Sequence, residues 1–220
     1  MRAFHLCTVS PCSFGSAIAL ATARAGHVAL LDAADSDWSG RATIADLAAK
    51  APVGARIGVR LDAGQAAALD GALDALADRE HWVTVANWHA ASLAAAVRAL
   101  VHSRRSIWVE ITDLGDVAVA EKACPEMFGW VARGSDAGGF AGRVSSFTLT
   151  QSLSRQARPF LVQGTIGLRA AAACRAAGAA GVILSDQLLL TAESPLPDPW
   201  RERLSKVECR DTVLAGDELG

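Results

Sequence analysis

Residues 131–142, V-A-R-G-S-D-A-G-G-F-A-G, combine four glycines with charged and polar residues directly after an apolar run. Glycine adopts positive φ angles easily and has no Cβ that would block a ligand, so such a loop brings backbone close to a bound molecule. Successive backbone N–H groups in a turn of this kind can form a nest for an anion. The alternative is a flexible surface loop, which has a similar glycine content.

Two later segments also place polar residues and glycine at the end of a short apolar run. The first is 163–167, Q-G-T-I-G, and the second begins with Ser185 and Asp186. Gly167 starts a segment of helical pattern, and the first amides and the dipole of a helix favour an anion. Together with the glycine loop, these turns predict a phosphate-binding site. The alternative at Gly164 and Gly167 is a tight turn between a strand and a helix.

These turns must be positioned by the surrounding elements. Short apolar runs alternate along the chain with Ala-rich segments of helical pattern, which makes eight units of a strand followed by a helix. Such alternation implies parallel strands with right-handed crossovers, and near-continuous apolar strands are typical of a sheet covered by helices. The sequence therefore predicts a compact (β/α)8 TIM barrel, whose active site lies at the C-terminal ends of the strands.

The boundaries of the predicted units follow from these runs. We predict strands at 3–9, 27–32, 56–61, 82–88, 106–112, 127–133, 159–163 and 181–184, and helices at 14–25, 39–51, 64–76, 90–101, 116–124, 145–156, 168–177 and from 199 or 200 to 207. The alternative fold is an open doubly wound sheet. The first turn, S-P-C-S-F-G-S at 10–16, lacks the G-x-G-x-x-G pattern of a dinucleotide-binding fold.

Few polar residues at the predicted strand ends could transfer a proton. His89 is the only histidine just past the C-terminal end of a predicted strand, and Ser135 lies in the glycine loop, so both are candidate catalytic residues. The alternative for His89 is a helix cap or a surface position. Glu110 falls within a predicted strand, where it either points into the barrel mouth or pairs with Arg60 or Arg133.

Composition excludes several classes of protein. Half of the 220 residues are hydrophobic, and the net charge is −2. The sequence lacks the basic patch that is typical of proteins that bind nucleic acids. No run of about 18 apolar residues exists that could span a membrane. The five cysteines show no metal-ligand spacing, which favours buried, reduced thiols in a cytoplasmic protein.

The segment G-S-D-A-G-G-F-A-G at 134–142 resembles the glycine motif of the nitronate monooxygenase family, formerly called 2-nitropropane dioxygenases. That family includes the FMN-dependent enoyl-acyl-carrier-protein reductases. The segment L-V-Q-G-T-I-G at 161–167 resembles its Gly-Gly-Ile turn, and 177–194 resembles its last barrel strand with the segment that follows. In detail the chain is most similar to the flavin barrels of polyketide and polyunsaturated fatty acid synthases, from about residue 130 onwards.

The resemblance implies FMN as the cofactor and assigns its phosphate to the turns after the seventh and eighth strands. Asp136 stands where the family has Glu, and Phe140 stands where the family has the histidine that acts on nitronates. Because phenylalanine cannot move a proton, nitronate oxidation by the usual mechanism is disfavoured. The carboxylate of Asp186 would repel a phosphate. The predicted cofactor-binding residues are Gly138, Gly139, Gln163, Gly164, Thr165, Ile166, Gly167, Ser185 and Asp186.

We therefore expect an FMN-dependent oxidoreductase of the enoyl-thioester reductase type, with NADH or NADPH as co-substrate. The resemblance implies an acyl thioester on a carrier protein and the other domains of a megasynthase as partners. The alternatives are a nitronate monooxygenase and a degenerate, non-catalytic barrel that serves as a structural or docking module. We expect residues 1–208 to form the barrel and 209–220 to form a tail towards a following domain, so that the chain is a piece of a longer polypeptide.

Overall fold

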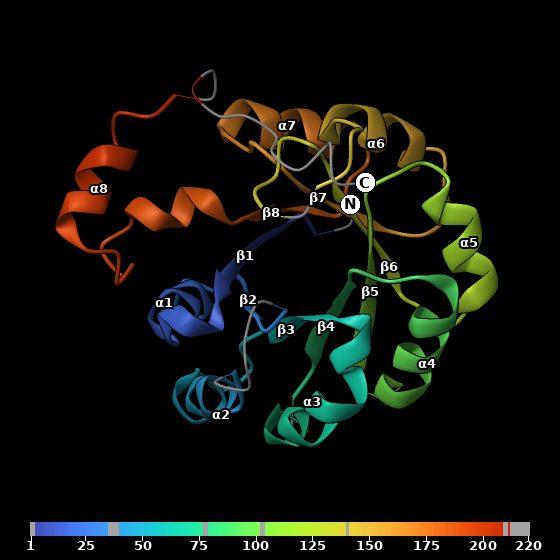
Figure 1. Cartoon of the computed structure of the whole chain (residues 1–220), viewed down its shortest axis with the longest axis horizontal. Helices are drawn as coiled ribbons and strands as arrows, with labels where there is room; N and C mark the ends of the chain where they lie inside the picture. The colour runs from blue at the N-terminus through green and yellow to red at the C-terminus, as the bar shows by residue number, and fades with distance from the viewer. Residues whose placement is uncertain are drawn as a thin grey trace.

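The protein is a closed barrel of parallel strands (Figure 1). The computed structural model describes residues 3–34, 40–76, 79–101, 104–139, 141–208 and 211. Within them, the strands pair in chain order, and pairing of the first with the eighth closes the sheet. The predicted (β/α)8 fold is confirmed. The strands are β1 His5–Pro11, β2 Val28–Asp32, β3 Ile57–Asp62, β4 His81–Ala86, β5 Arg105–Ile111, β6 Gly129–Arg133, β7 Phe160–Gln163 and β8 Gly181–Leu184.

Helices follow the strands and, from α1 to α7, lie around the outside of the sheet, whereas α8 stands off at one side (Figure 1). Among the described residues, none of these helices is long and apolar enough to cross a membrane. The helices are α1 Ala17–Arg24, α2 Gly40–Lys50, α3 Ala66–Leu73, α4 Ala90–Leu100, α5 Asp116–Ala123, α6 Ser146–Leu153, α7 Leu168–Ala176 and α8 Asp198–Leu204; short 3₁₀ helices are η1 Cys12–Phe14, η2 Ala63–Gln65, η3 Asp74–Leu76 and η4 Asp186–Leu190.

Most element boundaries agree with the prediction, and the differences have local causes. The strand predicted to reach Trp88 ends at Ala86, because Asn87 takes a left-handed conformation with φ of 45° that breaks the strand. The helix predicted over 64–76 is divided into η2, α3 and η3, and α1 begins three residues later than predicted. The predicted tail at 209–220, apart from Asp211, lies outside the described residues.

Apolar side chains fill both faces of the sheet, as parallel strands covered by helices require. The outer layer between strands and helices is the larger cluster and includes Leu93, Trp130 and Leu149. Inside the barrel, the rings of Trp82 and Trp108 lie 4.8 Å apart between their centroids. The interior cluster consists of Cys7, Val9, Val28, Leu30, Trp82, Trp108, Val131, Leu161 and Ile183.

Replacing Trp108 by alanine should destabilise the barrel strongly. The Trp108 side chain is 1% exposed inside the barrel, and truncation of a buried tryptophan costs about 3–5 kcal/mol. Trp200→Ala is the matched control, because Trp200 on α8 is 56% exposed and should change the free energy of unfolding by about 0.5 kcal/mol or less. Urea unfolding followed by far-UV circular dichroism measures both variants, and similar losses in the two would contradict the packed interior.

Candidate active site

The structure brings the three predicted turns together at one end of the barrel. Arg133, the last residue of β6, pairs with Gln163 at the end of β7, and Gln163 pairs with Ile183 of β8. The glycine loop, the 163–167 turn and the turn at Ser185 therefore follow three adjacent strands. This end is the C-terminal face, where active sites of such barrels lie.

In the glycine loop, the backbone lies directly against the turn after β8. Gly139 has a φ of 74°, which favours glycine. A Cβ built on Gly138 would overlap the carboxylate of Asp186. Two residues that the sequence assigned separately to the cofactor site are thus in contact with each other. Phe140, the residue on which the argument against nitronate oxidation depends, lies outside the described residues.

The carboxylate of Asp136 joins the glycine loop to the turn after β7 and to the start of α6. Its Oδ1 accepts a hydrogen bond from the Ser146 amide at 2.9 Å, and its Oδ2 accepts one from the Thr165 amide at 2.9 Å. The hydroxyl of Ser146 also donates to Oδ2 at 2.8 Å. A Cβ at Gly164 would overlap this oxygen, so a larger residue there would break the contact. Sequence reasoning did not foresee this clamp.

Burial alone would raise the pKa of Asp136, but the amides of Ser146 and Thr165 and the Ser146 hydroxyl favour the charged form and lower the pKa below its usual value. The carboxylate is therefore ionised at neutral pH. A carboxylate of the chain itself already occupies amides that could have bound the anion of a ligand.

The start of α7 keeps its amides open towards the surface. Gly167 is the N-cap residue, and no side chain caps this helix. A Cβ built on Gly167 meets nothing within 4 Å, so the space beyond the helix start is free among the described residues. The neighbouring η4 also begins without a side-chain cap at Ser185. Both helix starts present backbone N–H groups, which suits an anion.

The side chain of Gln187 holds these two turns together. Its amide nitrogen donates to the carbonyls of Gly164 at 3.3 Å and of Ile166 at 3.4 Å, and its oxygen accepts from the Ser185 amide at 3.1 Å. The sequence places Gln187 in the turn after the eighth predicted strand without indicating a role for it. The only available signal was its position directly after Asp186 in the polar turn.

Charged side chains line the barrel below these turns. Arg60 donates from Nε and Nη2 to both oxygens of Glu110, at 2.6 and 3.0 Å, and from Nη1 to both oxygens of Asp32, at 3.0 and 3.1 Å. Burial alone would lower the pKa of Arg60, but the charges and hydrogen bonds of Glu110 and Asp32 outweigh it and raise the pKa. The guanidinium of Arg60 therefore stays charged.

Arg133 completes the network from β6. Its Nη1 lies 3.5 Å from Glu110 Oε1, and its Nη2 donates to the carbonyl of Gly138. Glu110 thus pairs with both arginines that the sequence offered as partners. The arginine connects the buried charges with the glycine loop, so the loop is anchored to the barrel interior as well as to α6.

The two candidate catalytic residues occupy different surroundings. His89 is exposed and is the N-cap residue of α4, where its Nδ1 accepts a hydrogen bond from the Ser92 amide at 3.3 Å. Ser135 is half-buried in the glycine loop, and its amide donates to the Val144 carbonyl at 2.9 Å. A catalytic role for either residue stays a prediction.

Cysteines of the described chain are buried and free, as predicted: Cys7, Cys12, Cys124 and Cys174. Burial raises the pKa of Cys7 and of Cys12 to about 12, which keeps both as thiols. Cys209 lies outside the described residues. In the part of the chain that the structure describes, no group of three or more His, Cys, Asp or Glu residues could hold a metal ion.

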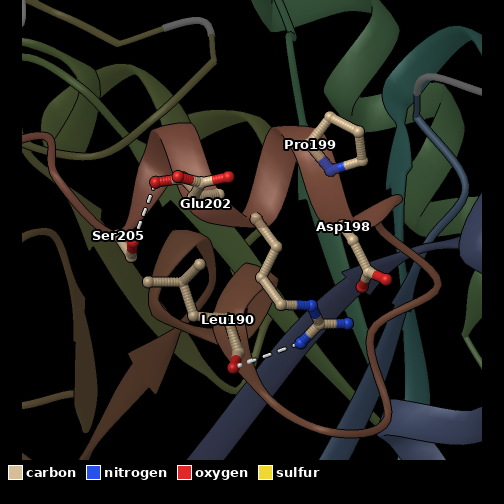
Figure 2. Close-up of a pocket in the computed structure, with 6 residues that line it drawn as sticks. Leu190, Asp198, Pro199, Glu202 and Ser205 are labelled. Carbon is tan, nitrogen blue, oxygen red and sulfur yellow. Dashed lines mark hydrogen bonds between the residues drawn. The ribbon is translucent and has the colours of Figure 1, made fainter.

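A separate surface hollow of about 600 Å³ lies beside α8 and contains none of the predicted site residues. Figure 2 shows Leu190, Asp198, Pro199, Glu202 and Ser205 around it. The guanidinium of Arg201, which also lines the hollow, donates to the carbonyls of Leu190, Thr191 and Ser194. The hollow is therefore partly filled by a side chain that fastens α8 to the segment before it.

In comparisons by sequence, no protein-family model and no curated protein matches the chain. Comparisons by structure find similar barrels. FabK from Thermotoga maritima superposes with a TM-score of 0.82 at 23% identity, over 99% of this chain and 70% of FabK. The enoyl reductase domain of MlnA from the macrolactin biosynthesis cluster of Bacillus amyloliquefaciens gives 0.72 at 10% identity, over 94% of this chain and 59% of that one.

A mandelate oxidase variant with a C4a-OH-FMN adduct gives a TM-score of 0.58 at 16% identity, over 90% of this chain and 70% of the oxidase. All three likenesses lie below 25% identity. They establish that the chain shares the TIM-barrel fold with these proteins.

Asp136→Asn should remove a pH-dependent part of the stability. Because the folded-state pKa of Asp136 lies below its usual value of 3.8, the charged carboxylate stabilises the fold above that pH, and this contribution is lost as the pH falls through the lower folded-state pKa. From about pH 6 to about pH 3, wild type should lose about 1 kcal/mol more stability than the variant, since solvent screens this exposed carboxylate.

Urea unfolding at each pH measures this difference. Glu202→Gln is the matched control, because Glu202 is an exposed carboxylate on α8 that pairs only with Lys206 among the described residues. The control should lose stability with falling pH as wild type does. If the stability of Asp136→Asn falls with pH as steeply as that of wild type, the hydrogen bonds of the Asp136 carboxylate do not stabilise the fold as proposed.

Proposed function

We propose that the chain is an FMN-dependent oxidoreductase of the enoyl-thioester reductase type and acts as a domain of a polyketide or fatty acid synthase. NADH or NADPH supplies the hydride, and the substrate is an acyl thioester on a carrier protein. Likeness to a barrel described as an enoyl reductase domain, and to an oxidase with an FMN adduct, supports this proposal. The motif at 134–142 supports it from the sequence.

The observation that carries the proposal is the uncapped start of α7 beside the turn at Gly164. TIM barrels commonly bind a phosphate with the loops after strands seven and eight and a short extra helix. In this chain α7 begins without a side-chain cap, η4 is the short helix after β8, and Gln187 holds the two turns together. These residues fit the phosphate end of FMN.

FMN would supply hydride transfer to the substrate when bound. The residues of this chain would supply position and charge. The amides at the start of α7 would hold the phosphate, with Ser185 at the start of η4, and the turn from Gln163 to Gly167 would line it. Gly138 and Gly139 bring backbone to the ligand without side chains in between. Arg60, Glu110 and Arg133 would form the charged floor below it.

A non-catalytic barrel is the second candidate, and one observation favours it. The Asp136 carboxylate takes the Thr165 and Ser146 amides, and the Asp186 carboxylate lies against Gly138. Two acids at the predicted cofactor site weaken binding of a phosphate dianion by like-charge repulsion. In that case the barrel serves as a structural or docking module of the synthase.

Gly167→Asp should weaken FMN binding without harming the fold. An N-cap carboxylate satisfies the open amides of α7 and repels a phosphate, and the added side chain meets free space. Gly167→Asn is the matched control, because it caps the helix without charge. We expect FMN to bind Gly167→Asp about tenfold or more weakly than Gly167→Asn, a difference of about 1.4 kcal/mol, in absorbance titrations of the flavin.

Riboflavin, which lacks the phosphate, should bind the two variants equally. Asp186→Asn should act in the opposite direction and tighten FMN binding but not riboflavin binding. Equal FMN affinities for Gly167→Asp and Gly167→Asn would place the phosphate elsewhere and remove the main support for the proposed cofactor site.

Turnover separates the candidate functions. Without oxygen, the FMN-loaded chain should oxidise NADH or NADPH over many turnovers only when an enoyl thioester on a carrier protein is present as the electron acceptor, with the saturated acyl thioester as product by mass spectrometry. Oxygen-dependent turnover of a nitronate would instead support the monooxygenase alternative. A folded chain that retains no flavin and turns over neither substrate would favour the non-catalytic barrel.

A further inference from the structure

Arg133 is a buried cation at the inner edge of the candidate site. It is 5% exposed and is the last residue of β6. Side chains alternate along a strand, and Val131, two residues earlier, belongs to the cluster inside the barrel. The Arg133 side chain therefore starts on the inner face of the barrel, at its C-terminal end. It reaches the underside of the glycine loop through the carbonyl of Gly138.

The two buried arginines, Arg60 and Arg133, differ in how many of their N–H donors have a hydrogen-bond acceptor. Arg60 bonds both oxygens of Glu110 and both oxygens of Asp32. Among the described residues, Arg133 has only a 3.5 Å contact with Glu110, whose carboxylate Arg60 already holds, and the bond to the Gly138 carbonyl. Its Nε is buried and has no partner among the described residues. A buried donor without a partner is rare in proteins and calls for an explanation.

Other unpaired polar atoms inside the barrel do not suit a ligand in the same way. Thr84 Oγ1 and Trp108 Nε1 are also without partners in the described structure. Thr84 and Trp108 pair across β4 and β5 in the strand interior, below the ends of the strands. They are neutral, whereas Arg133 is charged and lies beside Gln163 at the mouth. Of these three residues, Arg133 is the one that lies at the C-terminal end of its strand.

We propose that Arg133 is a ligand-binding residue whose Nε–H donates a hydrogen bond to a carbonyl oxygen of the molecule held over the barrel mouth. The guanidinium is preset for this role, because Glu110 and the Gly138 carbonyl fix its two other nitrogens. Charge-assisted hydrogen bonds of this kind are stronger than neutral ones. The identity of the carbonyl rests on the proposed function, and two molecules could supply it.

The first source is the thioester carbonyl of the substrate. When a hydride adds to the β carbon of an enoyl thioester, the C=C electron pair moves towards the carbonyl, whose oxygen gains negative charge; NADH or NADPH would be the source of the hydride, and bound FMN would transfer it. Arg133 would stabilise that charge. The α carbon then takes a proton from water, which completes the reduction. The second source is a ring carbonyl of the flavin, in which case Arg133 orients the cofactor.

Wild-type protein labelled with ¹⁵N tests the proposal without turnover. The arginine Nε–H signal of Arg133 is assigned by its loss in Arg133→Lys, and the signal of Arg60, whose Nε is bonded to Glu110, serves as an internal control. FMN, and separately a saturated acyl thioester that cannot be reduced, are titrated against the protein without its cofactor and then together. We expect the Arg133 signal to shift with one ligand while that of Arg60 stays.

Arg133→Gln should weaken the same ligand by about tenfold to a hundredfold, as expected for loss of one charge-assisted hydrogen bond. Arg98→Gln, an exposed change on α4, is the matched control and should leave both affinities unchanged. If Arg133→Gln weakens the binding of FMN alone, the acceptor of the Nε–H hydrogen bond is the flavin carbonyl. If it weakens the binding of the thioester alone, the acceptor is the substrate carbonyl.

The outcomes separate this inference from the proposed function. Thioester binding through Arg133 in a chain that never binds FMN would end the proposed function and leave the inference standing. FMN binding with an unmoved Arg133 signal for both ligands would overturn the inference and leave the cofactor proposal standing. If neither ligand binds wild type, both fail.

Discussion

The carboxylate of Glu110 holds the charged interior of the barrel together. It accepts two hydrogen bonds from Arg60, which also binds Asp32, so one guanidinium links β2, β3 and β5. On the other side it meets Arg133 of β6, which reaches the Gly138 carbonyl. Buried charges are tolerated only when each is compensated. Without Glu110, two guanidinium groups would face each other inside the barrel, so the shape of the mouth depends on this carboxylate.

The repeating units could be predicted, because burial on both faces produces continuous apolar runs. The meeting of the three polar turns at one end of the barrel could be predicted as well, because each turn follows one of three adjacent strands. Local backbone effects, such as the left-handed Asn87, moved boundaries by a few residues. The contacts between turns could not be predicted. Asp136 meets Thr165 and Gln187 meets Gly164 only because β6, β7 and β8 pair in one particular register. A sequence shows an acidic residue in a loop but not which amides it will meet.

The two acids at the mouth have different effects on an incoming anion. The carboxylate of Asp136 accepts hydrogen bonds from the amides of Ser146 and Thr165, so its charge is compensated within the protein. Asp186 is exposed beside Gly138, where its charge remains available to repel a phosphate. The start of α7 acts in the opposite sense, since its dipole attracts an anion. The affinity of this end of the barrel for an anion therefore depends on a balance of a few local charges.

The way α8 is fastened has a mechanical consequence. None of its residues is buried, and Arg201 ties it to the carbonyls of Thr191 and Ser194, in the segment that leads from η4. Among the described residues, these hydrogen bonds attach the helix to the segment that precedes it. A pull on α8 is transmitted along this short link to η4, the element that carries Asp186 and Gln187 at the rim of the mouth. A displacement of α8 would therefore reach the candidate site first at η4.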